Sequence, residues 1–289
     1  MDYAIHVLII STIYIILASS LNLLIGYTGI LSIAHAAFMG VGAYVSSLLG
    51  LSLGMNFFGS LILGALSAAV ISALIAFPTI RIKGDYYIIA SFAIQVIIYS
   101  IFMNWDSLTH GAIGLTGIPK PVIFGYEIVS RNSYFLLTLF FTFLTLLFIN
   151  KLVTSPFGRI LKAIREDEIA AQSMGKNVVY YKTVVFIVGC TLASVAGSLY
   201  AHYIAFIDPS SFTLEESIFI LSLVIIGGAG NLKGPILGAL VLTFVPELLR
   251  FLHISASAAG PVRQMIYGAL LIIFMLFRPQ GLFGEYKLR

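Results

Sequence analysis

The chain has 289 residues, of which 60% are hydrophobic and 10% are charged, and its mean hydropathy is +1.04. Since about 25% of the residues in an ordinary soluble domain are charged, this composition excludes such a domain and predicts an all-α polytopic integral membrane protein with one transmembrane domain, 1–289. The net charge of +4 lies largely in a few short loops, which indicates membrane topology and not a nucleic-acid-binding surface.

Nine apolar stretches are candidate membrane spans, because about 20 apolar residues in a helix cross the hydrocarbon core of a bilayer. They cover 4–25, 31–50, 58–78, 86–103, 133–150, 183–203, 216–229, 235–252 and 263–277; the seventh is short for a span. The first stretch follows no basic residue and shows no obvious small-residue cleavage site. We therefore expect a retained span and not a signal peptide.

The distribution of basic residues predicts the orientation, because Lys and Arg collect in cytoplasmic loops. If nine spans alternate, Arg81, Lys83, Lys233, the six basic residues of 151–182 and the three after the ninth span fall on one side. The other side holds Asp2, the mixed-charge segment 104–132 and the loop 204–215, which has no Lys or Arg. We expect a multi-pass protein of the cell membrane with its N-terminus outside and its C-terminus in the cytoplasm.

The second span and the residues just before it are crowded with small residues, as 26–44 reads GYTGILSIAHAAFMGVGAY. Small residues let helix backbones approach closely, and they also permit unwound helix where a segment lines a cavity. Close packing explains any single glycine. For the whole segment we expect a pathway-lining element, because lipid would not solvate its polar groups. The candidate pathway residues here are Gly29, Ser32, His35, Gly40 and Tyr44.

Asn22, Gln95 and Glu247 are further polar residues within predicted spans, where a side chain facing lipid is costly. Glu247 and Arg250 are one helical turn apart and are expected to pair near the outer end of the eighth span. Gln95 has no evident partner in the sequence and joins the candidate pathway residues.

The segment 104–119, NWDSLTHGAIGLTGIP, is rich in glycine and turn-forming residues and is external by the charge distribution. Loops carry function but also vary freely. Two roles stay open, contact with a delivered substrate and simple connection of two spans.

The segment 155–182, SPFGRILKAIREDEIAAQSMGKNVVYYK, is the one long hydrophilic stretch with a regular pattern. Ser155 is a suitable N-cap, Pro156 suits the first helical position and Gly175 can end a helix in the left-handed conformation. We expect one surface helix of about five turns. Its apolar stripe, interrupted at Asp167, comprises Ile160, Ile164, Ala171 and Met174, with Ala163 and Ala170 beside it.

The charges on this helix favour a protein partner over lipid. Helices that lie on lipid headgroups usually carry mainly Lys and Arg, whereas here three basic residues are matched by the acidic run 166–168. Solvated faces of mixed charge are also common, so an interfacial helix is the alternative.

A short pattern recurs 201 residues later in the chain. Ile25, Gly26, Gly29 and Leu31 match Ile226, Gly227, Gly230 and Leu232. Interrupted segments at matching positions in two halves of a transporter point to the substrate site. Gly227 and Gly230 are therefore further candidate pathway residues, with a chance match as the alternative.

The sequence shows no motif typical of an enzyme active site. It contains no H-E-x-x-H and no G-x-S-x-G, and GGAGNLKG departs from the phosphate-loop pattern at Leu232 and Gly234. Cys190 is the only cysteine, which excludes an intrachain disulfide and a cysteine-based metal site. No metal site is expected, and a transporter is the indicated class.

Four separated segments occur in a defined order: 26–44, RIKGDYYIIASFAIQVI (81–97), GRILKAIREDEIAAQSMGKNV (158–178) and IGGAGNLKGPILGA (226–239). Together they resemble the branched-chain amino acid permease family of ABC importers, in particular the M-type class that pairs with a second, related permease. The resemblance covers most of the chain from Gly26 to about Ala239.

The resemblance implies that 155–182 is a cytoplasmic coupling segment that sits in a groove on an ATP-hydrolysing subunit. The residues to which it assigns this contact are Arg159, Arg165, Glu166, Glu168, Ala170 and Gly175. It also implies two permeases, two ABC ATPase subunits and an extracytoplasmic substrate-binding protein. This chain would then need no cofactor of its own, because the partner subunits bind the ATP.

The resemblance implies leucine, isoleucine, valine or other hydrophobic amino acids as substrates, while relatives that carry urea, amides or other amino acids leave the substrate open. A secondary carrier driven by protons or sodium is the alternative class, for which only Glu247 loosely fits an ion site. A purely structural membrane subunit is a third class of protein to consider. Neither alternative explains the cytoplasmic helix.

Overall fold

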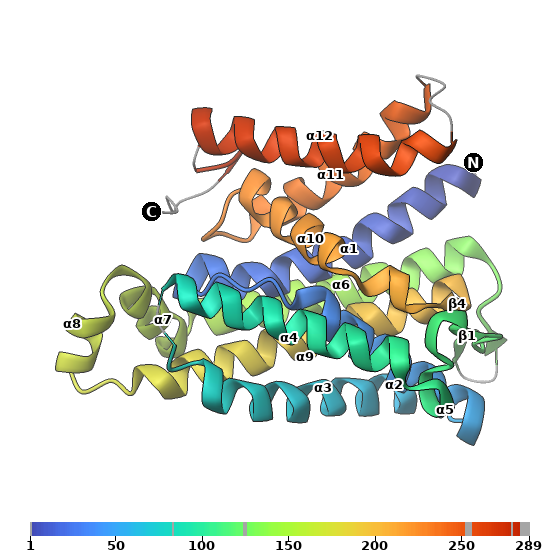
Figure 1. Ribbon diagram of the computed structural model, residues 1–289, viewed down its shortest axis with the longest axis horizontal. Coiled ribbons are helices and arrows are strands. Elements are labelled where there is room, and N and C mark those ends of the chain that lie inside the picture. The colour runs from blue at the N-terminus through green and yellow to red at the C-terminus, as the bar shows by residue number, and fades with distance from the viewer. Residues whose placement is uncertain (1, 83, 124–125, 252–255, 279, 284–289) are drawn as a thin grey trace.

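The computed structural model describes residues 2–82, 84–123, 126–251, 256–278 and 280–283 (Figure 1). The described part is almost entirely helical, in agreement with the predicted fold class. Its long helices are α1 (Asp2–Thr28), α2 (His35–Leu53), α3 (Phe57–Thr79), α4 (Asp85–Asn104), α6 (Arg131–Thr154), α9 (Val178–Ile204), α10 (Leu214–Gly227), α11 (Lys233–Phe251) and α12 (Ala256–Phe277). The shorter helices are α5 (Asp106–Thr109), η1 (Gly111–Ile113), α7 (Pro156–Glu166), α8 (Glu168–Ser173) and η2 (Pro209–Phe212).

Two small antiparallel strand pairs interrupt the helical pattern. β1 (Leu115–Thr116) pairs with β4 (Phe206–Ile207), and β2 (Val122–Ile123) pairs with β3 (Tyr126–Glu127). The first pair ties the segment after α4 to the end of α9. The predicted connecting segment 104–119 is therefore folded onto the bundle.

Seven helical segments of the described part are long and apolar enough to cross a membrane: Tyr3–Thr28, His35–Leu53, Phe57–Thr79, Asp85–Asn104, Arg131–Thr154, Val178–Ile204 and Pro209–Gly227. They correspond to the first seven predicted spans. The last two predicted spans fall on α11 and α12, where the described apolar stretches are shorter, Lys233–Val245 and Gln264–Phe274. The chain is thus a multi-pass membrane protein. Glu247 and Arg250, predicted to pair, lie in α11 but their side chains are outside the described part.

The three helices α1, α2 and α9 form the centre of the bundle. α1 packs against α6, α9, α10 and α11, and α2 packs against α3 and α9. By contrast, α3, α4 and α6 each present many exposed apolar side chains, among them Ile62, Leu66, Val70, Leu74, Ile89, Ile97, Leu136, Phe140 and Phe143. This division is typical of a membrane bundle in which lipid or a partner subunit covers the outer helices.

Small residues bring α2 and α9 into close contact. A Cβ atom on Gly42 would lie 2.1 Å from the Ser194 carbonyl oxygen, and one on Gly197 would lie 1.8 Å from the Met39 carbonyl oxygen. The Ser198 hydroxyl donates to the Gly42 carbonyl at 3.1 Å. The predicted role of the small residues in close helix packing is therefore confirmed for this interface.

The predicted single helix over 155–175 is wrong, because the structure divides it into α7 and α8 at Asp167. Asp167 has an extended backbone (φ −153°, ψ 107°), and its Oδ1 accepts hydrogen bonds from the Ile169 and Ala170 amides at 2.9 and 3.0 Å. An aspartate that caps the helix after it ends the helix before it. The predicted N-cap at Ser155 and the left-handed Gly175 (φ 75°) are confirmed.

The bundle has two distinct ends (Figure 1). α7 and α8 lie at one end, while α5, β1, β4 and the start of α1 lie at the other. Any functional coupling between the two ends must therefore be transmitted along the long helices.

Candidate functional site

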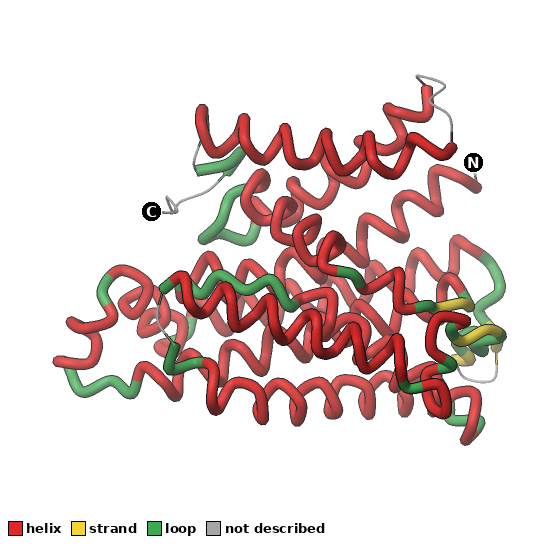
Figure 2. The backbone as a smooth tube through the Cα atoms, in the orientation of Figure 1, coloured by secondary structure: helices red, strands yellow, loops and turns green. Residues whose placement is uncertain are grey.

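The first feature of the candidate site is that α2 begins about halfway along its neighbour α4. After α1 ends at Thr28, residues 29–34 are not helical, and they run beside α4 before α2 starts at His35 (Figure 2). The Ile33 amide donates to the Ser91 hydroxyl at 3.0 Å, and the Ala37 amide donates to Gln95, which lies at the middle of α4. Within the predicted span 31–50, the helix therefore begins at His35.

Side chains from two other helices accept hydrogen bonds from backbone amides in the first turn of α2. The Ala37 amide donates to Gln95 Oε1 at 2.9 Å, and the Ala36 amide donates to the Ser217 hydroxyl at 3.0 Å. Ser217 in turn donates to Gln95 Oε1 at 3.0 Å, while Gln95 Nε2 donates to the Phe212 carbonyl at 2.8 Å. The first amides of a helix have no intrahelical partner. Gln95 is thus a structural partner of α2, although the sequence showed none.

His35 also points into the protein and is buried. Its Nε2 lies 2.8 Å from the Ser20 hydroxyl, which is itself 2.8 Å from the Leu17 carbonyl. Because a carbonyl can only accept, Ser20 donates to Leu17 and accepts from His35. The partner of His35 is therefore a hydroxyl. The Ser32 hydroxyl accepts from the Ala34 amide at 3.4 Å and is buried as well.

Gly40 and Tyr44 face an aromatic cluster. The Tyr44 ring stacks on Phe102 with centroids 4.5 Å apart, and Phe212 lies 5.9 Å away. A Cβ atom on Gly40 would lie 2.5 Å from Phe102 and 3.0 Å from Phe212. The Tyr44 hydroxyl is buried without a hydrogen-bond partner among the described residues. In this conformation the two candidate pathway residues therefore lie against closely packed rings.

The two copies of the repeated glycine pattern meet in space. Asn22 joins them, because its Nδ2 donates to the Asn231 carbonyl at 2.8 Å and its Oδ1 accepts from the Gly230 amide at 3.0 Å. A Cβ atom on Gly26 would lie 2.4 Å from the Gly230 amide nitrogen, and one on Gly227 would lie 2.1 Å from the Gly234 carbonyl oxygen. The end of α1 and the turn between α10 and α11 thus form one unit, which sequence separation alone did not reveal.

Arg165 connects α7 to this unit. Its Nη1 donates to the Gly26 carbonyl at 2.7 Å, and its Nη2 forms an ion pair with Glu166 at 2.5 Å. Nearby, Lys162 Nζ lies 5.7 Å from the centre of the Tyr27 ring. Cations stabilise helix C-termini, so Arg165 and Lys162 together hold the last turn of α1. Gly29 has a φ of 73°, and a Cβ atom on this residue would lie 3.6 Å from Arg165 Cγ.

The remaining residues predicted to contact a partner divide into two groups. Arg159, Glu166, Ala170 and Gly175 are exposed, whereas Arg165 is turned inward, with 12% of its side chain exposed against 63% for Glu166. Glu168 forms an ion pair with Lys182 on α9 at 2.7 Å. Three of the six predicted contact residues, Arg165, Glu166 and Glu168, are thus engaged in contacts within the chain.

The apolar stripe also differs from the prediction, because the break at Asp167 changes the direction of α8. Ile164, Ala171 and Val178 form a small buried cluster, and Ile160 packs against it. Leu161 is buried in the main core, whereas Met174, predicted in the stripe, and Ala170, predicted beside it, are exposed. Ile169 and Met174 are 71% and 65% exposed. The sequence analysis did not identify Ile169 as part of an outer apolar surface.

Comparison with known proteins agrees with the transporter architecture. The family model described as the permease component of branched-chain amino acid transport systems matches residues 3–275. The high-affinity branched-chain amino acid transport system permease protein LivM of Escherichia coli is 33% identical over 94% of this chain and 68% of its own length. The probable LivM of Methanocaldococcus jannaschii is 28% identical over 78% of this chain and 68% of its own length.

The chain is also similar to a second permease type. The high-affinity branched-chain amino acid transport system permease protein LivH of Escherichia coli is 27% identical over 94% of this chain and 91% of its own length. These matches identify a transport component and not an enzyme. Since the match spans almost the whole length, the chain belongs to the family of branched-chain amino acid transport system permease components.

Proposed function

We propose that this chain is the M-type permease of an ATP-driven importer for branched-chain or other hydrophobic amino acids. Its LivM relatives are named for branched-chain amino acid transport, which supports the substrate class. The observation that carries the proposal is the α7–α8 pair, which combines an exposed mixed-charge surface with two exposed apolar side chains, Ile169 and Met174. A surface of this kind suits a protein partner better than lipid.

The partner on α7 and α8 is an ABC ATPase subunit, and the movement it produces reaches the pathway through a continuous set of contacts. Arg165 on α7 bonds to the Gly26 carbonyl at the end of α1. The non-helical residues 29–34 follow at once and lead into α2. In this hypothesis ATP binding moves α7, α1 and the start of α2 together, and the bundle exposes its substrate site to each side in turn.

The functional particle contains two permeases, two ATPase subunits and an extracytoplasmic binding protein. The similarity of this chain to both LivM and LivH proteins supports a second, related permease beside it. Nine spans, made of the seven long helical segments with α11 and α12, place α7 and α8 in the cytoplasm and the start of α1 outside. The basic residues around α7 and α8 support this orientation.

The decisive experiment reconstitutes the complex with its binding protein in lipid nanodiscs and measures ATP turnover as each amino acid is added. Leucine, isoleucine or valine should stimulate turnover, while urea and acetamide should not. If urea or an amide stimulates and the three amino acids do not, the chain serves a different substrate. If no compound changes turnover, and uptake instead follows a proton or sodium gradient, the importer proposal is wrong.

A further inference from the structure

The segment between α9 and α10, residues 205–213, turns back into the bundle from the end opposite α7 and α8. Its strand β4 pairs with β1 at that end (Figure 1). Beyond β4, the Phe212 carbonyl accepts a hydrogen bond from Gln95 Nε2 at 2.8 Å, and Gln95 lies at the middle of α4. The Phe212 side chain is fully buried. The segment thus carries one aromatic side chain from the end of the bundle into its interior.

The Phe212 ring fills a pocket whose walls come from α2, α4 and α9. Its centroid lies 5.9 Å from that of Tyr44, 6.3 Å from that of Phe102 and 6.4 Å from that of Tyr200. Gly40 adds a wall without a side chain, since a Cβ atom there would lie 3.0 Å from Phe212 Cγ. The space enclosed by Gly40, Tyr44, Phe102 and Tyr200 is called here the ring pocket. Its walls suit an apolar side chain.

Gln95 places a fixed hydrogen-bond donor at the edge of the ring pocket. Its Oε1 accepts hydrogen bonds from the Ala37 amide at 2.9 Å and from the Ser217 hydroxyl at 3.0 Å. These two donors orient the side-chain amide, so that Nε2 donates to the Phe212 carbonyl. A carboxylate oxygen can accept from this donor as a carbonyl oxygen does. Apolar walls with a few placed polar groups are the usual composition of a small-molecule site.

The Tyr44 hydroxyl is a second polar group in the ring pocket. Tyr44 is 2% exposed, and its hydroxyl has no hydrogen-bond partner among the described residues. Buried polar groups are normally paired, because an unpaired one is unfavourable. This hydroxyl therefore points to a second state of the pocket, in which a polar group of a ligand pairs with it.

The segment that carries Phe212 can change without the helices beside it. It starts at Ala205, whose backbone has a φ of 59°, in the left-handed region that favours glycine. Residues other than glycine in this region are concentrated in switch segments and ligand clamps. Withdrawal of Phe212 breaks the hydrogen bond from Gln95 to its carbonyl and leaves α9 and α10 intact.

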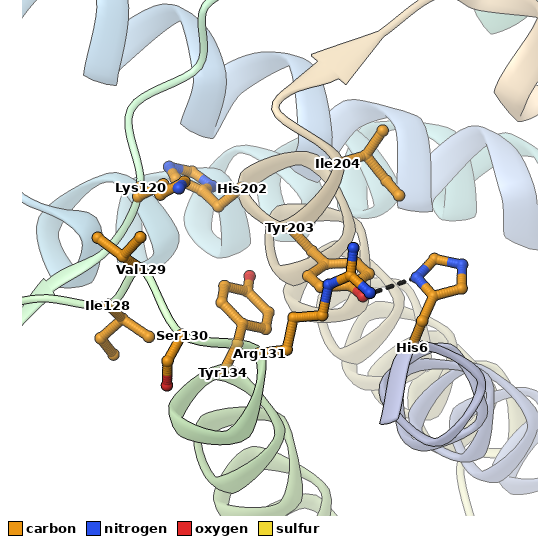
Figure 3. Close-up of a pocket in the computed structure, with 10 residues that line it drawn as sticks. All are labelled: His6, Lys120, Ile128, Val129, Ser130, Arg131, Tyr134, His202, Tyr203 and Ile204. Carbon is orange, nitrogen blue, oxygen red and sulfur yellow. Dashed lines mark hydrogen bonds between the residues drawn. The ribbon is translucent and has the colours of Figure 1, made fainter. Parts of the chain in front are cut away.

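Two open cavities at this end of the bundle lie apart from the ring pocket. One, of about 270 Å³, is formed by the start of α1, the end of α9 and the segment that leads into α6, where the His6 and Tyr203 side chains meet (Figure 3). The other, of about 280 Å³, shares Lys120 and His202 with it. Neither is lined by a residue of the ring pocket or by Phe212. In this conformation Phe212 therefore keeps the ring pocket filled.

We propose that Phe212 is an internal mimic of the substrate. When the segment 205–213 withdraws, the ring pocket binds the side chain of a hydrophobic amino acid, and Gln95 Nε2 donates to its carboxylate in place of the Phe212 carbonyl. Substrate and Phe212 then exclude each other, because both need the same space and the same donor. The inference rests on the proposed function, which supplies the class of substrate. It adds the residues that hold the substrate and the side chain that closes the empty site.

The test measures direct binding of radiolabelled leucine to the complete complex in nanodiscs, without the binding protein. Phe212→Ala should raise the apparent affinity by about tenfold or more, because a site that is seldom vacant binds its ligand weakly. The matched control is Phe206→Ala, in the same segment but 40% exposed and outside the ring pocket. It should bind leucine as the wild type does.

Competition by related compounds tests the two contacts separately. In the Phe212→Ala complex, leucinol, which has a hydroxymethyl group in place of the carboxylate, should compete about tenfold less well than leucine. Glycine, which has no side chain to fill the ring pocket, should also compete poorly. Equal competition by leucine, leucinol and glycine would show that neither contact is made, and the proposal would be wrong.

The outcomes separate this inference from the proposed function. If amino acids stimulate ATP turnover of the wild-type complex but Phe212→Ala, Phe206→Ala and wild type bind leucine equally, Phe212 does not occupy the substrate site, while the importer function stands. Should Phe212→Ala fail to assemble, Phe212→Val against Phe206→Val gives the same comparison with a smaller expected rise, and equal affinities would again overturn the inference. If the wild-type complex contains no ATPase, the proposed function itself fails.

Discussion

At the scale of single residues, Gln95 and Arg165 carry the most specific contacts of the candidate site. Gln95 is fully buried and supplies both an acceptor and a donor to parts of the chain far from it in sequence. Arg165 supplies a charged donor to a backbone carbonyl 139 positions away. Removing either side chain leaves backbone groups unpaired, and the two losses should have different effects.

Gln95→Leu should destabilise the protein, because the Ala37 amide and the Phe212 carbonyl would lose their partner inside the bundle. Each unpaired buried group costs about 1–3 kcal/mol. Thermal unfolding in detergent measures the loss. The control is Ser52→Ala, since the exposed Ser52 bonds only within its own helix, and it should change stability by about 0.5 kcal/mol or less. Equal stability of Q95L and wild type would show that Gln95 does not support α2.

Arg165→Gln should separate ATPase binding from transport. The variant loses a charge-assisted hydrogen bond worth about 1.5–3 kcal/mol, or about tenfold or more in the equilibrium that holds α7 on α1. The exposed surface of α7 and α8 remains. We therefore expect the ATPase to co-purify normally while amino acid uptake per ATP hydrolysed falls. Uptake at the wild-type ratio would exclude Arg165 from the coupling route.

At the scale of elements, the break between α7 and α8 decides which side chains face a partner. In a continuous helix Met174 would share the buried stripe with Ile164, but after the break at Asp167 it is exposed together with Ile169. The charged residues that the sequence singled out then form the margin of an apolar surface. Such apolar centres usually contribute more to affinity than the charged margin does.

Ile169→Asp combined with Met174→Asp should abolish co-purification of the ATPase with the permease. Two exposed apolar side chains that become buried at an interface contribute about 1.5–3 kcal/mol each, so their replacement by carboxylates weakens binding by about a hundredfold or more. Ile113→Asp is the control, because Ile113 is 79% exposed at the other end of the bundle. Retention of the ATPase by the double variant would place the docking surface elsewhere.

Local patterns in the sequence were enough to predict most helices, but they did not predict the contacts between the helices. Hydropathy located the long apolar helices, and Ser155, Pro156 and Gly175 marked the true ends of the segment that forms α7 and α8. Asp167 interrupted the apolar stripe visibly, yet a capping aspartate and a solvent-exposed one look alike in sequence. The start of α2 depends on Gln95 and Ser217, which lie 58 and 181 positions from their amide partners. No local pattern encodes such a contact.

At the scale of the whole molecule, the two ends of the bundle have different surfaces. One end carries α7 and α8, and the other carries α5 and the strands β1 and β4 (Figure 1). An importer needs this polarity, because it receives substrate on one side and energy on the other. The orientation in the membrane is therefore the property on which all other proposals depend.

Cysteine labelling measures this orientation directly. In a Cys190→Ala background, Tyr3→Cys and Tyr126→Cys should react with a membrane-impermeant maleimide in intact cells, and Ser173→Cys and Phe283→Cys should react only after permeabilisation. All four positions are exposed in the fold. The wild-type Cys190 is buried and should stay unlabelled. Labelling of positions 3 and 283 from the same side would contradict an odd number of spans.

The non-helical residues 29–34 give the chain an adjustable strut between the contact of α7 with α1 and the membrane interior. A residue advances about 1.5 Å in an α-helix and up to about 3.3–3.6 Å when extended. Winding or unwinding one turn at the start of α2 would thus change the reach of this strut by about 7 Å. A small tilt at the contact of α7 with α1 can in this way become a longitudinal stroke deep in the bilayer, while both flanking helices stay whole.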